Sequence, residues 1–153
     1  MEKTEIFAYK PIDESRRPLV VAGGFLVHNN RYLLLKRHPE KSYGHHWNLP
    51  AGKVEHNEDP QYGAQREIHE ETGIMIPLEN LTPVHVFYIR RGPLFIQFHV
   101  YHAFFDVAPD INLKMDENTE ASWVSHEEAL KLPLLSGGSE ILDFCMDKFK
   151  KKP

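Results

Sequence analysis

Long apolar runs separated by short polar stretches predict a protein built mainly from strands. Leu19–His28 and Arg31–Arg37 predict two neighbouring strands, and the leucines of the second, residues 33–35, are expected to be mostly buried. Asn29 and Asn30 between them tolerate the left-handed conformation of a tight turn, so the two strands should form a hairpin.

A second hairpin is predicted further along the chain. Thr82–Arg91 and Leu94–Val107 are rich in Val, Ile, Phe and Tyr, and a turn at residues 91–93 joins them. A polar loop over Ala108–Glu120 and a short strand over Ala121–Val124 should follow.

Three helices are predicted among these strands. Ser125 and Glu128 make a capping box for a short helix through Leu130, and Ser139 is expected to cap a last helix over Glu140–Lys150. The third helix, over residues 60–72, interrupts the strands. Helices on both sides of strands predict an α/β fold, a three-layer α/β/α sandwich with a mixed sheet.

The helix over residues 60–72 has clear signals at both ends. Asp59 is a good N-cap, Pro60 suits the first helical position, and Gly73 suits the left-handed position after the last turn. Its apolar stripe is thin and consists of Ala64, Ile68 and the methyl group of Thr72.

Three glutamates share one face of this helix. Glu67, Glu70 and Glu71 are three and four residues apart, so each like-charged pair costs an isolated helix roughly 0.2–0.5 kcal/mol. Glu70 and Glu71 also lie in the last turn, where the helix dipole disfavours negative charge. A hard divalent cation with oxygen ligands, Mg²⁺ or Mn²⁺ as a substitute, would compensate both effects. The alternative is a solvated acidic helix.

Two neighbours complete this acidic face. Gly63 has no side chain and is expected to leave room beside the carboxylates. Arg66 precedes Glu70 by four residues and should pair with it, which would orient the carboxylate.

The spacing of the defined residues over 52–74 resembles the signature of the Nudix hydrolases, the MutT-related family. Gly52 is followed after five residues by Glu58, and after seven more by the run from Arg66 to Ile74, in which every defined position is filled. The resemblance implies the Nudix-like fold and a single Nudix hydrolase domain over residues 1–153. It also implies Mg²⁺-dependent hydrolysis of a phosphoanhydride bond in a nucleoside diphosphate linked to another group.

The resemblance further implies a set of metal ligands. Glu70 and Glu71 are the leading ligands, Glu67 completes the set, and the carbonyl group of Gly52 is an additional ligand.

The general base varies within the family. Glu67 or Glu71 is expected to serve, and the later acids Glu117 and Glu120 are the alternatives, which would also lie near the substrate. Glu58 is expected to have a structural role.

Basic groups near the signature are candidates for phosphate binding. Arg37 ends a strand where related enzymes hold a phosphate, and Lys53 could neutralise a leaving group. Arg66 supports the catalytic carboxylates, and His46 is a candidate contact to a phosphate or a base. For each of these, a surface cation or a loop histidine with no function is the alternative.

Charge and composition exclude several classes of protein. The formal net charge is −4 and the basic residues form no stripe, which argues against binding to duplex nucleic acid. Cys145 is the only cysteine, so neither an intrachain disulfide nor a cysteine-based metal site is expected. No signal peptide or membrane span is evident, and a cytoplasmic protein is expected. A homodimer is possible.

The substrate is the least defined part of this interpretation. A (d)NTP or similar small nucleotide is expected, releasing pyrophosphate or phosphate, and a dinucleotide polyphosphate or a nucleotide sugar is the alternative. Six strand aromatics are available to contact a base, of which about half should point into the core: Phe25, Phe87, Tyr88, Phe95, Phe98 and Tyr101. Non-enzymatic alternatives are a nucleotide-binding sensor module and a protein-interaction domain.

Overall fold

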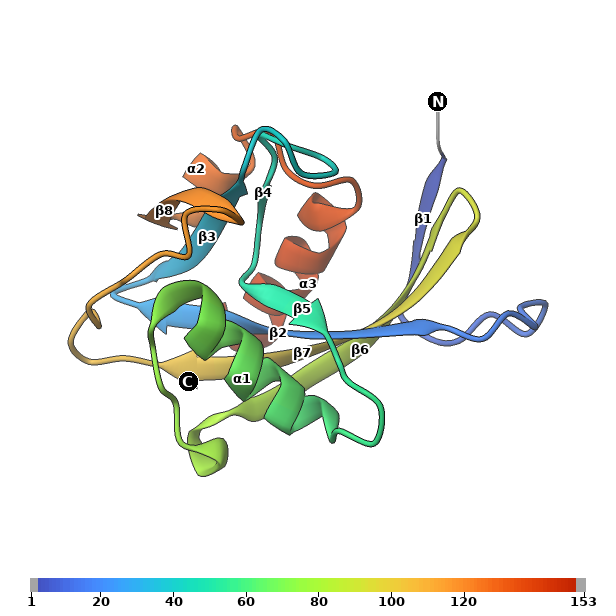
Figure 1. The fold of residues 1–153 in the computed structure, drawn as a ribbon, viewed down its shortest axis with the longest axis horizontal. Coiled ribbons are helices and arrows are strands. Elements are labelled where there is room, and N and C mark those ends of the chain that lie inside the picture. Colours follow the sequence, from blue (N-terminus) through green and yellow to red (C-terminus); the bar gives the residue numbers. More distant parts are fainter. Residues whose placement is uncertain (1–2, 151–153) are drawn as a thin grey trace.

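A mixed sheet lies between helices on both of its faces in the computed structural model, which describes residues 3–150 (Figure 1). The strands follow the order β1-β6-β7-β2-β3-β4, while β5 pairs with β2 and β8 pairs with β3. The elements are β1 (Thr4–Phe7), β2 (Leu19–His28), β3 (Arg31–Arg37), β4 (Trp47–Asn48), β5 (Ala51–Lys53), α1 (Pro60–Thr72), η1 (Leu78–Asn80), β6 (Thr82–Arg91), β7 (Leu94–Phe104), β8 (Asn118–Val124), α2 (His126–Ala129) and α3 (Gly138–Lys150).

Two hydrophobic cores lie on opposite faces of the sheet and confirm the three layers. On one face, Ala64 and Ile68 of α1 pack in a buried cluster with Leu26 of β2. On the other face, Ile141 of α3 packs with Phe25 of β2. The parallel pairing of β2 with β7, beside antiparallel pairs, makes the sheet mixed as predicted.

Both predicted hairpins form. Asn29 and Asn30 adopt φ values of 52° and 60°, and Gly92 adopts 56° in the turn between β6 and β7. Leu33, Leu34 and Leu35 are buried, as the first apolar run predicts. Trp47 and Cys145 lie in the core that contacts α3.

Three short strands, β1, β4 and β5, were not predicted, and the boundaries of two other strands differ from the prediction. Strand β7 ends at Phe104 and not at Val107. Strand β8 begins at Asn118 and not at Ala121, because residues 118–120 pair with β3 and so leave the predicted loop. Strand β1 was not predicted, since its partner is the distant strand β6.

Two helix boundaries also differ. Helix α3 begins at Gly138, directly after Gly137 with φ of 87°, so Ser139 lies inside the helix and is not its N-cap. Helix α2 has the predicted capping box at Ser125 but ends at Ala129, with Leu130 as its C-cap. In the part of the chain that is described, no helix is long and apolar enough to cross a membrane.

Close approach of β5 to β2 depends on Gly23. A Cβ atom at this position would lie 2.5 Å from both the carbonyl oxygen of Pro50 and the Cβ atom of Ala51. Because Gly23 and Ala51 are direct partners in the β2–β5 ladder, the glycine determines how closely β5, and with it Gly52, lies against the sheet.

We predict that Gly23→Ala destabilises the protein by about 2 kcal/mol or more, because the new methyl group meets backbone that cannot move without breaking the ladder. Urea unfolding measures the loss. Gly138→Ala is the control, since its Cβ would meet Leu134 at 3.3 Å, and a change within about 1 kcal/mol is expected there. Equal stability of the two variants would contradict the proposed role of Gly23.

Candidate active site

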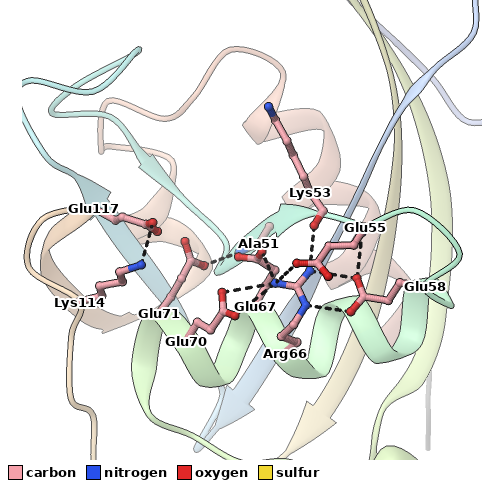
Figure 2. Close-up of polar contacts among 10 residues, drawn as sticks. All are labelled: Ala51, Lys53, Glu55, Glu58, Arg66, Glu67, Glu70, Glu71, Lys114 and Glu117. Atoms are coloured by element: carbon pink, nitrogen blue, oxygen red, sulfur yellow. Dashed lines mark hydrogen bonds and ion pairs between the residues drawn. The ribbon is translucent and has the colours of Figure 1, made fainter.

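Helix α1 begins and ends where the sequence predicts. The Asp59 side chain accepts a hydrogen bond from Gln61 N at 2.9 Å, and Gly73 adopts φ of 76° and donates its N–H to the carbonyl of His69 at 2.8 Å. The apolar stripe faces β2, so the glutamates of the last two turns lie beside β5 (Figure 2).

The guanidinium of Arg66 connects the acidic residues to one another (Figure 2). Its Nε and Nη2 donate to the two carboxylate oxygens of Glu58 at 2.8 and 2.9 Å, and its Nη1 donates to Glu67 at 2.8 Å. The predicted pair with Glu70 is present but longer, at 3.3 Å. Arg66 also donates to the carbonyl of Lys53 at 3.0 Å, so one side chain links α1 to β5 and to the loop between them.

Glu58 has the contacts of a structural residue. It accepts the N–H of Glu55 at 3.0 Å in addition to the two bonds from Arg66, and these bonds hold the pKa of its carboxyl group below the usual value. The expectation that Gly63 leaves open space is wrong. A Cβ at Gly63 would meet Glu58 and Val54 at 3.1 Å, because the loop before α1 packs against this side of the helix.

The signature over residues 52–74 is called the box below, and its box glutamates are Glu58, Glu67, Glu70 and Glu71. Glu71 is the most buried of them, with 6% of its surface exposed. It accepts hydrogen bonds from the N–H of Ala51 at 2.8 Å and from the side chain of Asn118 at 3.4 Å. Burial raises the pKa of Glu71 to about 8, and the nearby carboxylates of Glu67 and Glu117 add to the shift. Negative charge at this position is therefore under-compensated by the protein alone.

Glu67 lies against the backbone of β5. A Cβ atom on Gly52 would lie 2.1 Å from one carboxylate oxygen of Glu67, so only glycine leaves space for this carboxylate. Burial raises the pKa of Glu67, and the bond from Arg66 opposes that shift. The predicted ligands Gly52 and Glu67 are therefore direct neighbours.

In the described residues, no group of three or more His, Cys, Asp or Glu side chains is arranged to hold a metal ion. Glu67 faces Arg66, Glu71 faces Ala51, and the side chain of Glu70 is 48% exposed. The donor chemistry nevertheless fits a hard divalent cation, because only oxygen donors meet here and the carboxylates raise one another's pKa. Family membership, reported below, implies such an ion, and the complete ligand set stays a prediction.

The two later acids lie in different places. Glu117 is close enough to the box to raise the pKa of Glu67 and Glu71, and its own partner is Lys114 at 3.3 Å (Figure 2). Glu120 lies within β8, exposed, and pairs with Lys36 of β3 at 3.1 Å. Glu117 is therefore the better placed of the two as an alternative base.

A cavity of about 190 Å³ adjoins β5 and contains two of the predicted cations, Arg37 and Lys53, together with Gly52. The ammonium group of Lys53 points away from the glutamates, as Figure 2 shows. Arg37 also donates to the carbonyl of Ser42 at 2.7 Å. His46 is not among the residues that line this cavity, and its ring contacts loop carbonyls at 3.1 Å.

The expectation that half of the six strand aromatics face the core is wrong. Five are buried and only Tyr88 is partly exposed. Phe98 alone among the six lines the cavity beside β5, so these residues provide no broad aromatic surface for a base in that cavity.

Two groups that contact Glu71 were missed by the sequence interpretation. One is the backbone N–H of Ala51, which any residue could supply and which leaves no sequence signal. The other is Asn118, whose position in an acidic stretch resembled a loop and which is buried in β8. Recognising the longer β8 would have placed Asn118 opposite Arg37 in the ladder with β3.

Comparisons with known proteins show similarity over most of the chain. The NUDIX domain model matches residues 17–144. An uncharacterized Nudix hydrolase of Bacillus subtilis, YvcI, is 30% identical over 77% of this chain and 73% of its own length. An octanoyltransferase of Myxococcus xanthus is 32% identical over 66% of this chain, but the match spans only 28% of that protein. A MutT NUDIX hydrolase from Burkholderia pseudomallei has a similar structure, with a TM-score of 0.72 and 26% identity, covering 84% of this chain and 98% of that one.

The chain belongs to the NUDIX family, because the family model covers most of it and every defined position of the signature is filled. The domain is accordingly of the Nudix pyrophosphohydrolase class, which acts on nucleotide-linked substrates and generally uses divalent metal ions.

We predict that Gly52→Ala folds but impairs the site. The new methyl group displaces the mobile end of the Glu67 side chain and not backbone, so the circular dichroism spectrum should match wild type. The rise in melting temperature on adding a divalent cation should shrink, since it reflects binding to the native state. If the cation raised the melting temperature of Gly52→Ala as much as that of wild type, the position of Glu67 would be unimportant for binding the cation.

We predict a pH effect for the metal-free protein in EDTA. Because Glu71 binds a proton more tightly when the protein is folded than when it is unfolded, the contribution of Glu71 to stability is greatest at low pH and falls between about pH 5 and the folded pKa of about 8. Glu71→Gln keeps an acceptor for Ala51 N–H and should remove this fall, leaving the variant more stable than wild type at pH 9 by about 1 kcal/mol or more.

Urea unfolding across this pH range measures the effect. Glu79→Gln, at an exposed glutamate of η1, is the matched control and should follow the wild-type curve. Parallel curves for wild type and Glu71→Gln would contradict the raised pKa.

Proposed function

We propose that this protein is a Mg²⁺-dependent hydrolase that cleaves a phosphoanhydride bond in a nucleoside diphosphate linked to another group. The observation that supports the proposal best is the contact between β5 and α1. There the carboxylates of Glu67 and Glu71 lie directly against Gly52 and Ala51, next to a cavity that contains Arg37 and Lys53.

Glu67, Glu70 and Glu71, with the carbonyl group of Gly52, would hold the metal. Mn²⁺ is a possible substitute, since both ions prefer oxygen ligands. When bound, the ion supplies charge neutralisation at phosphate oxygens and lowers the pKa of a coordinated water.

The protein's own groups have distinct tasks in this proposal. Arg66 positions Glu67 and Glu70 and keeps β5 close to α1. Lys53 and Arg37 attract phosphate oxygens into the cavity. Glu67 is the favoured general base, because Glu71 is committed to the backbone N–H of Ala51.

The proposed substrate is a small nucleotide such as a (d)NTP, and a dinucleotide polyphosphate or a nucleotide sugar is the second candidate. The confined volume of the cavity, about 190 Å³, and the net charge of −4 favour a small ligand over duplex nucleic acid. We further propose that residues 1–153 act as one domain in the cytoplasm. A nucleotide-binding sensor would need no self-repelling carboxylates, which favours the enzyme.

We predict that Glu70→Gln lowers kcat by about 100-fold or more, because the metal ion that would stabilise charge in the transition state loses a carboxylate ligand. Phosphate and pyrophosphate release is measured with Mg²⁺ on a panel of nucleoside triphosphates, dinucleoside polyphosphates and nucleotide sugars. Glu79→Gln carries the same chemical change at an exposed glutamate outside the site and should retain wild-type rates.

The panel also tests the enzyme interpretation itself. Hydrolysis by wild type and not by Glu70→Gln supports it, and the preferred compound defines the substrate. Equal rates for both proteins, or no release by either, would contradict it.

A further inference from the structure

Two adjacent arginines at the end of β6 have opposite electrostatic surroundings. Arg90 forms ion pairs with three carboxylates, those of Asp13 at 2.6 Å, Glu14 at 3.1 Å and Glu5 at 3.7 Å. Arg91 is more deeply buried, with 7% of its surface exposed, and no ion pair joins it to a carboxylate among the described residues. Strand alternation sends the two side chains to opposite faces of the sheet.

The charge of Arg91 is only partly compensated. Its Nη2 donates to the carbonyl of Ser136 at 2.7 Å, and its guanidinium lies 5.2 Å from the ring centroid of Tyr43. Its Nε is buried and has no hydrogen-bond partner. An unpaired buried cation is costly, and such groups in native proteins are normally paired or bind a ligand.

Arg91 lines the same cavity as Arg37 and Lys53. Among the side chains that the structure describes, neither Arg37 nor Lys53 forms an ion pair with a carboxylate. The cavity also contains Gly138, the first residue of the 13-residue helix α3, whose N-terminus adds partial positive charge. Three cations that form no ion pair among the described residues therefore line one small space together with a helix N-terminus.

Apart from the polar residues Asn48 and Ser136, the rest of the cavity wall is mostly apolar. It includes Ile89, Ile96, Phe98 and Ile141 of the core on the α3 side of the sheet. The box glutamates lie on the α1 side. Gly52 borders both, because it touches Glu67 and also lines the cavity. An anion at Arg91 is thus distinct from the phosphates that the glutamates and their metal would hold.

We propose that Arg91 binds a phosphate group of the substrate that is additional to the diphosphate at the glutamates. This proposal rests on the proposed function and narrows it. The substrate class is a nucleotide that carries a third phosphate, either within a longer polyphosphate chain or on the group attached to the diphosphate. Phosphate fits better than carboxylate, since its higher charge matches three cations, and arginine can bind it through two parallel hydrogen bonds as it does a carboxylate. A nucleotide sugar with a neutral sugar lacks this group.

The binding step is tested without turnover. Titration calorimetry with inorganic phosphate in EDTA compares wild type, Arg91→Gln and Arg91→Lys, with Arg90→Gln as the matched control on the same strand. We expect affinity to fall by about tenfold or more in Arg91→Gln, to be partly retained in Arg91→Lys, and to be unchanged in Arg90→Gln. Equal affinity of wild type and Arg91→Gln would overturn the proposal.

A second measurement needs no variant and covers the case in which Arg91→Gln does not fold. In ¹⁵N-labelled wild type, the Nε–H signal of Arg91 should shift on addition of phosphate, since this group has no partner in the protein. An Arg91 signal that stays in place while other cavity signals move would place the anion elsewhere and refute the assignment.

Kinetics then separate a phosphate contact from a general structural role. Arg91→Gln should lower kcat/KM about tenfold or more for a nucleoside triphosphate, mainly through KM, and leave a nucleotide sugar with a neutral sugar unaffected. An equal loss for both substrates would indicate that Arg91 only supports the loop at Ser136. If wild type hydrolyses nothing, the proposed function fails while the calorimetric result for Arg91 still stands.

Discussion

A single guanidinium, that of Arg66, organises the acidic site. It contacts the carboxylates of Glu58, Glu67 and Glu70 and the carbonyl of Lys53, so it joins the helix, the preceding loop and strand β5. One positive charge cannot neutralise three carboxylates. The remaining negative charge is felt at the buried Glu71, whose pKa is raised to about 8 first by burial and then by its neighbour Glu67. Arg66 thus holds the acidic groups close together and leaves a net negative charge that a divalent cation can neutralise.

The sequence predicts this helix well because its signals are local. Asp59, Pro60 and Gly73 act through hydrogen bonds and backbone angles within a few residues, and each is found in its predicted position. The Asn29-Asn30 turn is predictable for the same reason. Glu58 was expected to have a structural role at the start of the helix, and the structure shows it in direct contact with Arg66.

Features that depend on distant partners were not predictable in the same way. Strand β1 pairs with residues more than eighty positions away, and its four residues carry no distinctive pattern. The start of β8 depends on pairing with β3. The space beside Gly63 is occupied by Val54 and Glu58, which lie outside the helix. The cavity is the clearest case, because its wall comes from β2, β3, β4, β5, β6, β7, α3 and the segment just before α3. Alternation along β6 separates Arg91 from Arg90, but no local pattern shows that Arg91 reaches this cavity.

Separation of charge across β5 explains how both signs can persist beside one another. If the cations of the cavity faced the box glutamates directly, they would pair with them and neither set would be available to a ligand. Strand β5 prevents this, because the carboxylates approach it from the α1 side while Arg37, Lys53 and Arg91 line the α3 side. Gly52 borders both sides, since it lies against Glu67, has no side chain and also lines the cavity. A polyphosphate that passes this point can satisfy a metal on one side and the cations on the other, which a ligand with a single anionic group cannot do.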